Sequence, residues 1–349
     1  MRRIGWISLV LSCCLLFLSA CATAGGGDRK QGANGKDDFS AGMVTDTGGL
    51  NDESFNQTTY EGLKRAQKEL GIDIKALESK RDEDYVPNLT KFAREGRDMV
   101  WGVGFKFDKA ISDVANQFQN VQFGIVDSDL GGKIPKNVTA VTFKEEEGSF
   151  LMGVIAGLTT KTNKVGFIGG ISSPLIKKFE VGYRAGVLTV NPKAKVQVAY
   201  AESFNDVTKG RSLAKAMYDG GADIIYHAAG GVGKGLFDEV KSRKKGKYWA
   251  IGVDMDQSRL APDHTLSSMI KKVDVAVYNV MKAQQQKKHQ AGKVLQFGLK
   301  ENGVGYAETT KRHVKPDVLK RVDEYKRKIA NKELVVPTSE ADLHQFIKS

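Results

Sequence analysis

A short segment after the first apolar run of the chain body gathers residue types that suit ligand binding. It begins at Asp46 and continues through Asn51 and Asp52 to Phe55 and Asn56, where a helical pattern starts. An aromatic ring among carboxylates and amides can stack on a flat ligand while its neighbours form hydrogen bonds with the ligand's edge. The segment is therefore a candidate binding site.

The same segment is also a well-formed turn between a strand and a helix. Gly48 and Gly49 permit a tight turn, and Ser54 with Gln57 has the spacing of a capping box. These features alone require no ligand. The turn does not explain the aromatic Phe55 at the helix start.

Two further segments carry a carboxylate and an aromatic ring at comparable positions. Asp127 follows an apolar run and can accept a hydrogen bond from a ligand N–H, while Asp129 is close enough to suggest a shared cation. The oxygen spacing of a calcium loop is missing, so we expect no metal site. Phe179 lies near the start of a predicted helix, where it either faces a ligand or packs in the core.

The glycine-rich segment 230–235 is the third candidate. Its spacing does not match a dinucleotide fingerprint, and it lacks the Lys-Ser/Thr ending of a phosphate-binding loop. Gly230 and Gly231 instead suit a close approach of backbone N–H groups to a small ligand. Asp254 and Lys271 end the next two predicted strands.

The elements that position these residues alternate along the chain. Apolar runs predict strands, amphipathic stretches between them predict helices, and such alternation is typical of parallel sheets with right-handed crossovers. The predicted strands are 39–45, 72–77, 98–103, 121–127, 138–143, 164–169, 195–201, 223–228, 248–253 and 265–270. The predicted helices are 57–70, 107–118, 145–160, 176–189, 207–219, 233–243 and 273–287.

The strands divide into two series near residue 144, which predicts an α/β protein with two doubly wound parallel-sheet lobes. Ligands of such sheets bind at the carboxyl ends of the strands, so the candidate residues of both lobes should meet in one cleft. At 349 residues the chain is long enough for two lobes. We see no short internal repeat.

The first residues predict an export signal and a lipid anchor. Arg2 and Arg3 precede an uncharged apolar run, and the run ends in Leu-Ser-Ala-Cys, which resembles the lipobox of bacterial lipoproteins. We expect residues 1–20 to be the signal peptide, Cys21 to be lipidated, and residues 21–37 to be a flexible Gly-rich tether. The alternatives are an ordinary signal peptide and an uncleaved anchor.

Composition and net charge limit the classes of protein and of binding partner that the sequence allows. The sequence is 41% hydrophobic and 27% charged, which excludes disordered and polytopic membrane proteins. The net charge of +12 would suit nucleic acid or an anionic surface. Because the signal directs the protein out of the cytoplasm and no nucleic-acid motif is present, we expect an anionic membrane surface and no nucleic acid.

Eight motifs in order resemble the basic membrane protein family, which comprises lipoproteins of the purine-nucleoside receptor type. They are the 46–56 segment, Gly104-Phe105, Val126-Asp127, GFIGG, Phe179 with GYRAG, AAGGVGKG, GVDMDQ and SSMIKKVD, and the likeness covers about residues 38–345. This family is similar to type I periplasmic binding proteins and supplies the substrate-binding component of ABC importers.

The resemblance implies a role for each candidate residue. Phe55 and Phe179 would enclose a purine, and Asp127 would accept hydrogen bonds from the base. The first lobe would contribute Asp46, Asn51, Asp52 and Asn56, while Asp254, Lys271, Gly230 and Gly231 would surround the ribose. Asp129 departs from the family pattern, in which apolar residues follow the carboxylate.

The resemblance also implies a lobe division and a function. The chain would cross between lobes near 143–145, 267–271 and 295–300, giving a first lobe of 38–143 with 268–296 and a second of 144–267 with 297–349. We expect a monomeric, lipid-anchored, extracytoplasmic receptor that needs no cofactor and delivers purine nucleosides (guanosine, adenosine, inosine) to an ABC permease.

Three alternatives stay open. An enzyme is disfavoured because no nucleophile elbow or zinc-binding helix is present and the five histidines are scattered. A receptor for a sugar or an autoinducer-like solute could use the same scaffold, since fold does not determine ligand. An adhesin could use the lysine-rich stretches, which are more simply solvated faces.

Overall fold

The computed structural model describes residues 39–348. The predicted signal peptide (1–20), lipidation site (Cys21) and tether (21–37) lie outside the described residues. Within the described residues no helix is long and apolar enough to cross a membrane.

The first sheet has six parallel strands in the order β11-β5-β4-β3-β1-β2. Their bounds are β1 (Ser40–Thr45), β2 (Asp73–Glu78), β3 (Met99–Val103), β4 (Gln122–Val126), β5 (Val138–Phe143) and β11 (Lys293–Phe297). The central strands are buried along almost their whole length, because helices cover both faces of the sheet.

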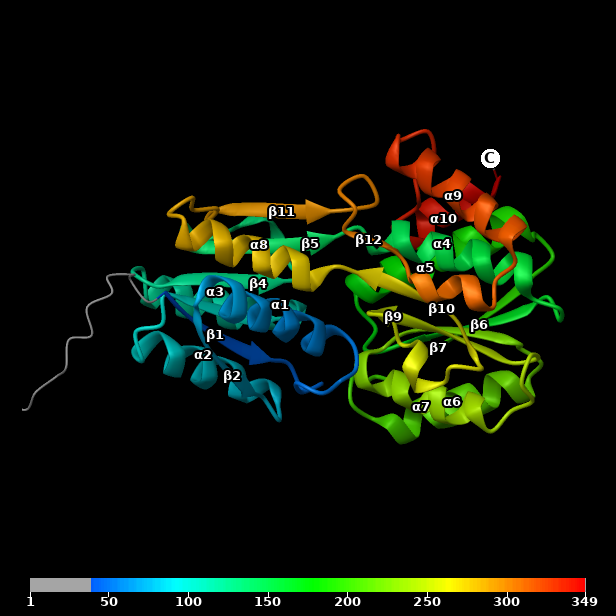
Figure 1. The fold of residues 1–349 in the computed structure, drawn as a ribbon, viewed down its shortest axis with the longest axis horizontal. Coiled ribbons are helices and arrows are strands. Elements are labelled where there is room, and N and C mark those ends of the chain that lie inside the picture. Colours follow the sequence, from blue (N-terminus) through cyan, green and yellow to red (C-terminus); the bar gives the residue numbers. More distant parts are fainter. Residues whose placement is uncertain (1–38, 349) are drawn as a thin grey trace, which may run out of the picture. The chain divides into compact units, whose positions relative to one another are not determined.

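Neighbouring residues on these strands point to opposite faces and join different apolar clusters. Met43 and Trp101 pack with helices α1 (Phe55–Leu70) and α8 (Val273–Gln285), whereas Val44 and Val100 pack with α2 (Tyr85–Arg94) and α3 (Asp108–Gln117). Figure 1 shows α1 and α8 side by side, although more than 200 residues separate their starts. The alternation of the strands therefore determines which helices cover each face.

The second sheet has the order β12-β10-β9-β8-β6-β7. Its strands are β6 (Lys164–Gly169), β7 (Lys195–Tyr200), β8 (Ile224–Ala228), β9 (Trp249–Asp254), β10 (Thr265–Lys271) and β12 (Val304–Tyr306). All pairs are parallel except β10 with β12, which is antiparallel. The two lobes thus confirm the predicted fold class, with one antiparallel edge strand added.

Helices cover both faces of the second sheet as well. Phe167 packs with α4 (Glu145–Thr159) and α5 (Pro174–Val190), whereas Ile168 packs with α6 (Val207–Asp219) and α7 (Gly233–Lys241). The remaining helices, α9 (Pro316–Ala330) and α10 (Glu340–Lys348), pack on α4 and α5. Short 3₁₀ turns are η1 (Asp82–Asp84), η2 (Phe105–Phe107), η3 (Leu130–Gly132), η4 (Gly230–Val232), η5 (Ser258–Leu260) and η6 (Glu308–Arg312).

Glycines let α4 and α5 approach closely. A Cβ atom at Gly186 of α5 would overlap the carbonyl oxygen of Phe150, and one at Gly153 of α4 would overlap that of Tyr183. The two backbones therefore touch where the helices cross, and no larger residue fits there.

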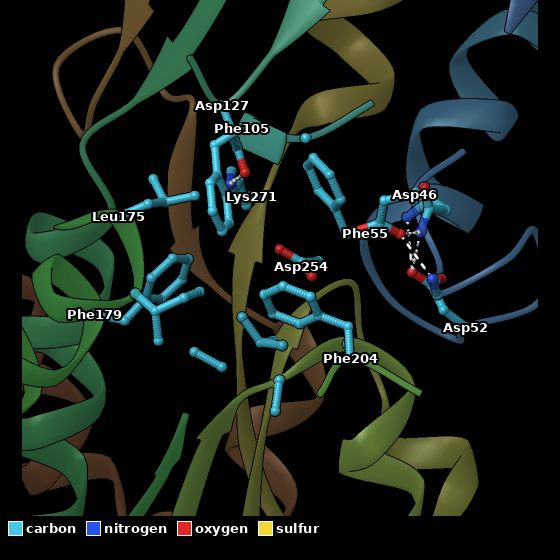
Figure 2. Close-up of a pocket in the computed structure, with 18 residues that line it drawn as sticks. Asp46, Asp52, Phe55, Phe105, Asp127, Leu175, Phe179, Phe204, Asp254 and Lys271 are labelled. Carbon is cyan, nitrogen blue, oxygen red and sulfur yellow. Dashed lines mark hydrogen bonds and ion pairs between the residues drawn. The ribbon is translucent and has the colours of Figure 1, made fainter. Parts of the chain in front are cut away.

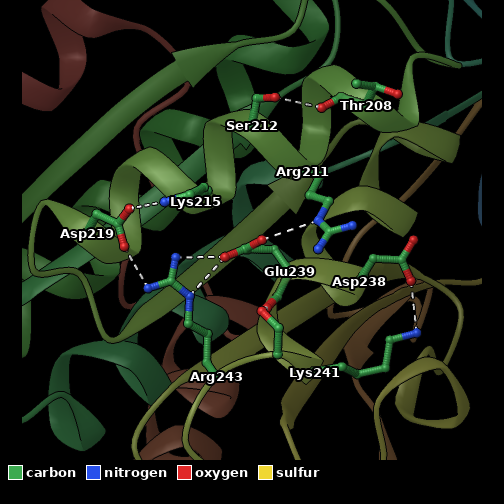
Figure 3. Close-up of polar contacts among 10 residues, drawn as sticks. Thr208, Arg211, Ser212, Lys215, Asp219, Asp238, Glu239, Lys241 and Arg243 are labelled. Carbon is green, nitrogen blue, oxygen red and sulfur yellow. Dashed lines mark hydrogen bonds and ion pairs between the residues drawn. The ribbon is translucent and has the colours of Figure 1, made fainter.

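Polar contacts on α6 and α7 join these helices (Figure 3). The buried carboxylate of Glu239 accepts hydrogen bonds from Arg211 and, in a fork, from Arg243, which also contacts Asp219. Lys215 pairs with Asp219 as well. Opposite charges on this face of the second lobe thus largely neutralise each other.

The chain passes between the sheets after β5, after β10 and after β11. The predicted boundary at 267/268 falls inside β10, which pairs with β9 and β12 up to Ile270 and Lys271 and belongs to the second sheet throughout. The boundary at 296/297 similarly divides β11, whose Phe297 pairs with Phe143 in the first sheet. Hydrogen-bonded register therefore places both boundaries one to four residues later along the chain.

Candidate functional site

A pocket lies between the carboxyl ends of the strands of the two sheets. The space between its walls, including the open mouth, is about 520 Å³. Its lining combines aromatic, aliphatic and acidic residues (Figure 2): Asp46, Gly48, Asp52, Phe55, Asn56, Gly104, Phe105, Asp127, Leu175, Ile176, Phe179, Phe204, Ala228, Ala229, Gly230, Val253, Asp254 and Lys271.

The polar wall of the first lobe is a connected network around Asn56. Its amide Nδ2 donates to Asp46 Oδ1 at 2.8 Å and to Asp52 Oδ2 at 3.1 Å. Asp46 also accepts from the backbone N–H of Gly48, and Asp52 accepts from those of Ser54, Asn56 and Gln57. The network holds the Asn56 side chain in one orientation in the pocket wall.

The capping of α1 differs from the prediction. Ser54 precedes the helix, but its side chain makes no capping hydrogen bond; Asp52 accepts the N–H groups of the first turn instead. A carboxylate at this position is favoured by the helix dipole. Ser54 Oγ is therefore free to donate to Asp254 of the other lobe.

The second lobe and the end of β4 contribute a buried charge cluster. Lys271 is 1% exposed, and its Nζ lies 2.5 Å from Asp127 Oδ2 and 3.3 Å from a carboxylate oxygen of Glu145. Burial alone would lower the pKa of Lys271, but Asp127, Glu145 and Asp254 raise it above its usual value. Lys271 is therefore charged at neutral pH and holds Asp127 in place.

Asp127 and Asp254 have backbone conformations that non-glycine residues rarely adopt. Their φ angles are +66° and +65°, in the left-handed region. Each follows or ends a central strand, so the unusual turn directs its side chain into the pocket. Strain of this kind costs on the order of 1–3 kcal/mol and is characteristic of functional sites.

Aromatic rings from both lobes enclose the pocket. Phe55 and Phe179 both face Lys271, whose Nζ lies 5.1 Å and 5.5 Å from their ring centroids. Phe105 and Phe204 form an edge-to-face contact across the lobes, with centroids 6.3 Å apart. Figure 2 shows these four rings grouped around the carboxylate of Asp254.

Two oxygen atoms of the lining residues have no hydrogen-bond partner in the protein. They are Asn56 Oδ1 and Asp127 Oδ1, and both atoms are buried. Buried acceptors without a partner are uncommon, because the lost hydrogen bond to water is not replaced. The pocket therefore offers two fixed acceptors to the N–H or O–H groups of a ligand.

Nine of the eleven residues predicted for ligand binding line this pocket, and two do not. Asn51 is exposed and only its carbonyl oxygen is used, as an acceptor for Lys234. Gly231 lies behind the wall against the backbone of Phe204. The residue next to each of them, Asp52 and Gly230, occupies the wall instead.

The sequence prediction omitted several apolar lining residues, above all Phe105 and Phe204. Phe105 follows Gly104 directly after β3, at a strand end where a side chain should reach the pocket. Phe204 lies in the loop after β7, an edge strand whose loop would not be expected to reach the centre. Its ring packs over Gly170, where a Cβ atom would overlap it.

The segment from Thr47 to Ser54 also bridges the lobes beside the pocket. The carbonyl oxygen of Thr47 accepts from Asn205 at 3.0 Å, and that of Glu53 accepts from Gln257 Nε2 at 2.7 Å. The Glu53 carboxylate pairs with Arg259. One loop of the first lobe thus makes many of the polar contacts between the two lobes.

Residues 39–348 contain no group of three or more His, Cys, Asp or Glu side chains arranged to hold a metal ion. The carboxylates of the pocket are engaged by Asn56, Lys271, Ser54 and backbone N–H groups instead. The arrangement suits recognition of a neutral, partly flat molecule rich in hydrogen-bond donors.

The fold and the pocket define a two-lobed solute-binding protein. Comparison with known proteins agrees: a family model, Bmp, described as ABC transporter substrate-binding protein PnrA-like, matches residues 39–340. The chain belongs to this family, whose members are extracytoplasmic, membrane-associated solute-binding proteins rather than enzymes.

Relatives and solved structures support the same assignment. The chain is 40% identical to a CD4+ T-cell-stimulating antigen of Listeria monocytogenes, over 92% of this chain and 94% of the relative. It is 39% identical to the ABC transporter nucleoside-binding protein BmpA of Lactococcus lactis, over 77% and 81%. An ABC transporter solute-binding protein of Aeropyrum pernix superposes with a TM-score of 0.80 at 25% identity, over 89% and 96%.

Proposed function

We propose that the protein captures purine nucleosides in the interlobe pocket and delivers them to an ABC importer. The observation that carries the proposal is the combination of aromatic rings from opposite lobes with the free acceptors Asn56 Oδ1 and Asp127 Oδ1. A purine offers two flat faces and several N–H groups, and ribose offers adjacent hydroxyls. The nucleoside-binding relative of Lactococcus lactis supports the same ligand class.

In this proposal each region of the pocket recognises one part of the ligand. Phe55 stacks on the base from the first lobe, and Phe179 faces it from the second. Asp127 and Asn56 accept from the base, while Asp254 and Lys271 bind the ribose hydroxyls, with Gly230 lining that end. Stacking on each ring contributes about 1–3 kcal/mol.

The charge of the pocket favours nucleosides over nucleotides. Its lining residues include four aspartates and one lysine, and Lys271 is already paired with Asp127 and Glu145. Burial raises the pKa of Asp46 and Asp254, and raises the pKa of Asp52 to about 7, so these carboxyl groups already ionise less readily than usual. A phosphate would therefore meet buried acidic groups with no free cation to bind it. We expect guanosine to bind and guanosine monophosphate to bind at least about a hundredfold more weakly, as repulsion of a few kcal/mol implies.

The proposal includes the cellular setting predicted from the sequence. Cys21 is lipidated after signal cleavage, so that the body, as a monomer, remains tethered to the outer face of the cell membrane near its permease. Two acyl chains or one chain with basic charge give stable attachment.

Isothermal titration of protein lacking residues 1–21, refolded free of carried-over ligand, tests the ligand. The panel is guanosine, adenosine, inosine, cytidine, ribose and galactose, and purine nucleosides should bind most tightly. Phe55→Ala should weaken that binding by about 5- to 150-fold, the equivalent of one stacking contact. Binding of a sugar with no response to nucleosides would refute the ligand assignment and favour the sugar-receptor alternative on the same scaffold.

A further inference from the structure

Most of the excess positive charge of the protein lies in the second lobe. Residues 39–143 with 272–297, which build the first lobe, contain 18 Lys and Arg against 17 Asp and Glu. Residues 144–271 with 298–348, which build the second, contain 30 against 21. The first lobe is thus nearly neutral at +1, and the second carries +9.

Within the second lobe, ten lysine and arginine side chains lie at or next to the amino ends of its strands, at the end of the sheet opposite the pocket. We call them the cationic edge: Lys161, Lys164, Lys193, Lys195, Lys244, Lys245, Lys247, Lys311, Arg312 and Lys315. All ten are exposed. The acidic residues on the same loops are Asp223, Asp263, Glu308 and Asp317, which leaves an excess of six positive charges.

Hydrogen bonds between the loops show that they form one contiguous surface. Asp223 accepts from Thr160 and from the backbone of Lys161, and its own carbonyl accepts from the N–H of Trp249. His264 and His313 connect the loops before β9, before β10 and after η6 through the carbonyls of Tyr248 and Pro262. The cations are therefore held together rather than scattered.

Most of these charges are not neutralised by the protein. Lys245 pairs with Asp263 and Lys311 contacts Glu308 at 3.9 Å, but Lys161, Lys195 and Lys315 take part in no ion pair among the described residues. The neighbouring face of α6 and α7 is different, because its cations pair with Asp219, Asp238 and Glu239 (Figure 3). Unpaired cations on one edge point to an anionic partner outside the protein.

The edge also contains a hollow between its loops. Its volume, including the open mouth, is about 990 Å³, and Lys161, Lys247, Lys315 and His313 line it together with Trp249, Asp223 and Asp317. A phosphate group entering this hollow would meet three lysines and two aspartates, and the carboxylate of Asp223 is already hydrogen-bonded to Thr160 and to backbone N–H groups. The large exposed hydrophobic residues of the described chain, Val86, Val198, Val294, Val335 and Ile347, lie outside it, so contact with a surface would be electrostatic and without insertion.

We propose that the cationic edge of the second lobe docks on the phosphate headgroups of an anionic lipid membrane. Charge complementarity supports this partner. If Cys21 is the anchor, the 17 residues between it and Phe39 span at most about 60 Å, so the body stays near the membrane. The tether joins the body at the amino end of β1 in the first lobe, so the cationic edge is a second attachment point, separate from the anchor. The edge lies away from the pocket, and this docking is independent of which ligand the pocket holds.

The test uses protein lacking residues 1–21, so that no acyl chain contributes, with vesicles of phosphatidylglycerol and phosphatidylcholine in equal parts. We expect co-sedimentation at low salt, its loss at high salt, and no binding to phosphatidylcholine alone. Each lysine near an anionic surface strengthens binding about fivefold, so the quadruple variant Lys161→Gln, Lys195→Gln, Lys244→Gln, Lys315→Gln should bind at least about a hundredfold more weakly.

A matched control separates the edge from total charge. The variant Lys68→Gln, Lys91→Gln, Lys282→Gln, Lys288→Gln removes four exposed lysines of the first lobe, and none of these is in an ion pair among the described residues. It should keep wild-type vesicle binding, and both variants should keep the wild-type melting temperature and ligand affinity. Equal losses in the two variants, or no vesicle binding, would overturn the proposal. Binding to soluble polyphosphate but not to vesicles would assign the edge to a linear polyanion instead.

Discussion

At the scale of single residues, the pocket is built from side chains that are held before any ligand arrives. Asn56 is fixed by two aspartates, Asp127 by Lys271, and Asp254 by Ser54 of the opposite lobe. The acceptors without a partner therefore point in defined directions. Such preorganisation reduces the entropy lost on binding.

His227 is a buried residue whose behaviour with pH can be predicted. It is fully buried in β8, its Nε2 is bonded to Gln257 Oε1, and its Nδ1 has no partner. Burial lowers the pKa of His227 to about 4, against a smaller opposing effect of the Gln257 hydrogen bond. The folded protein therefore keeps this histidine neutral.

The sign of the pH effect follows from proton binding. Between pH 6.5 and about 4 the unfolded chain takes up a proton at His227 that the folded protein does not, so the free energy of unfolding falls as pH decreases. The contribution approaches about 3 kcal/mol at the low end. His227→Gln should show a smaller loss of melting temperature between pH 6.5 and pH 4 than wild type.

The exposed His344 provides the control for that experiment. It lies on α10 near the end of the chain, with 68% of its side chain exposed. His344→Gln should reproduce the wild-type dependence of melting temperature on pH. If His227→Gln also does so, the buried neutral histidine is not the source of the effect.

At the scale of elements, the loop from Thr47 to Ser54 fastens the lobes to each other. Its pairs with Gln257 and Arg259 lie outside the pocket, so they should affect how long a ligand stays more than which ligand enters. Arg259→Ala should speed dissociation of the proposed nucleoside ligand about 2- to 10-fold, as expected for one lost hydrogen-bonded pair. Stopped-flow displacement measures this rate.

Arg211→Ala is the matched control for the loop contact. Arg211 has a similarly exposed side chain, 58% against 53% for Arg259, and also pairs with a glutamate, but within the second lobe. Its replacement should leave the dissociation rate unchanged. Equal effects of the two replacements would show that the bridge between lobes has no special role.

The contact between α4 and α5 supports a prediction about stability. Gly186→Ala places a methyl group against the carbonyl oxygen of Phe150, and the helices must separate. Overpacking of this kind costs about 1–3 kcal/mol, so the melting temperature should fall by several degrees. Gly305→Ala is the control, because a Cβ atom there meets nothing within 4 Å.

Sequence patterns predicted the central elements well and the later ones poorly. Apolar runs such as those of β3 and β8 are unambiguous because both faces are covered, and the candidate residues at strand ends followed from them. Strand β11 is half exposed at the sheet edge, and β12 is only three residues long, so neither has a distinct pattern. Helix α2 has a proline in its first turn, where proline is tolerated, but in the sequence a proline suggests the end of a helix.

The sequence did not allow us to predict which loop residues direct their side chains into the pocket. Asn51 adjoins a lining residue and carries the right chemistry, but it is exposed and only its carbonyl oxygen is used, by Lys234. Gly231 likewise adjoins a lining residue but packs against the backbone of Phe204. Phe204 shows the opposite case, since the six-residue loop 201–206 after an edge strand brings its ring into contact with Phe105 of the other lobe. Both depend on tertiary packing, which local spacing does not encode.

At the scale of the whole molecule, charge and binding are separated in space. The pocket collects carboxylates between the lobes, whereas the cations gather on the far edge of one lobe. The net charge that suggested a membrane surface from composition alone thus comes mainly from the second lobe, and the cationic edge supplies an excess of six charges of that lobe's nine. The net charge of the whole chain conceals both the acidic pocket and the cationic edge.

The three passages of the chain between the sheets also affect how the protein can be made. The first sheet acquires its edge strand β11 only from residues 293–297, about 150 residues after the neighbouring β5, and the second acquires β12 later still. During synthesis or export neither lobe is complete until nearly the whole chain has emerged. A contiguous fragment therefore cannot reproduce either lobe, and a chain that ends after β10 leaves both sheets without an edge strand.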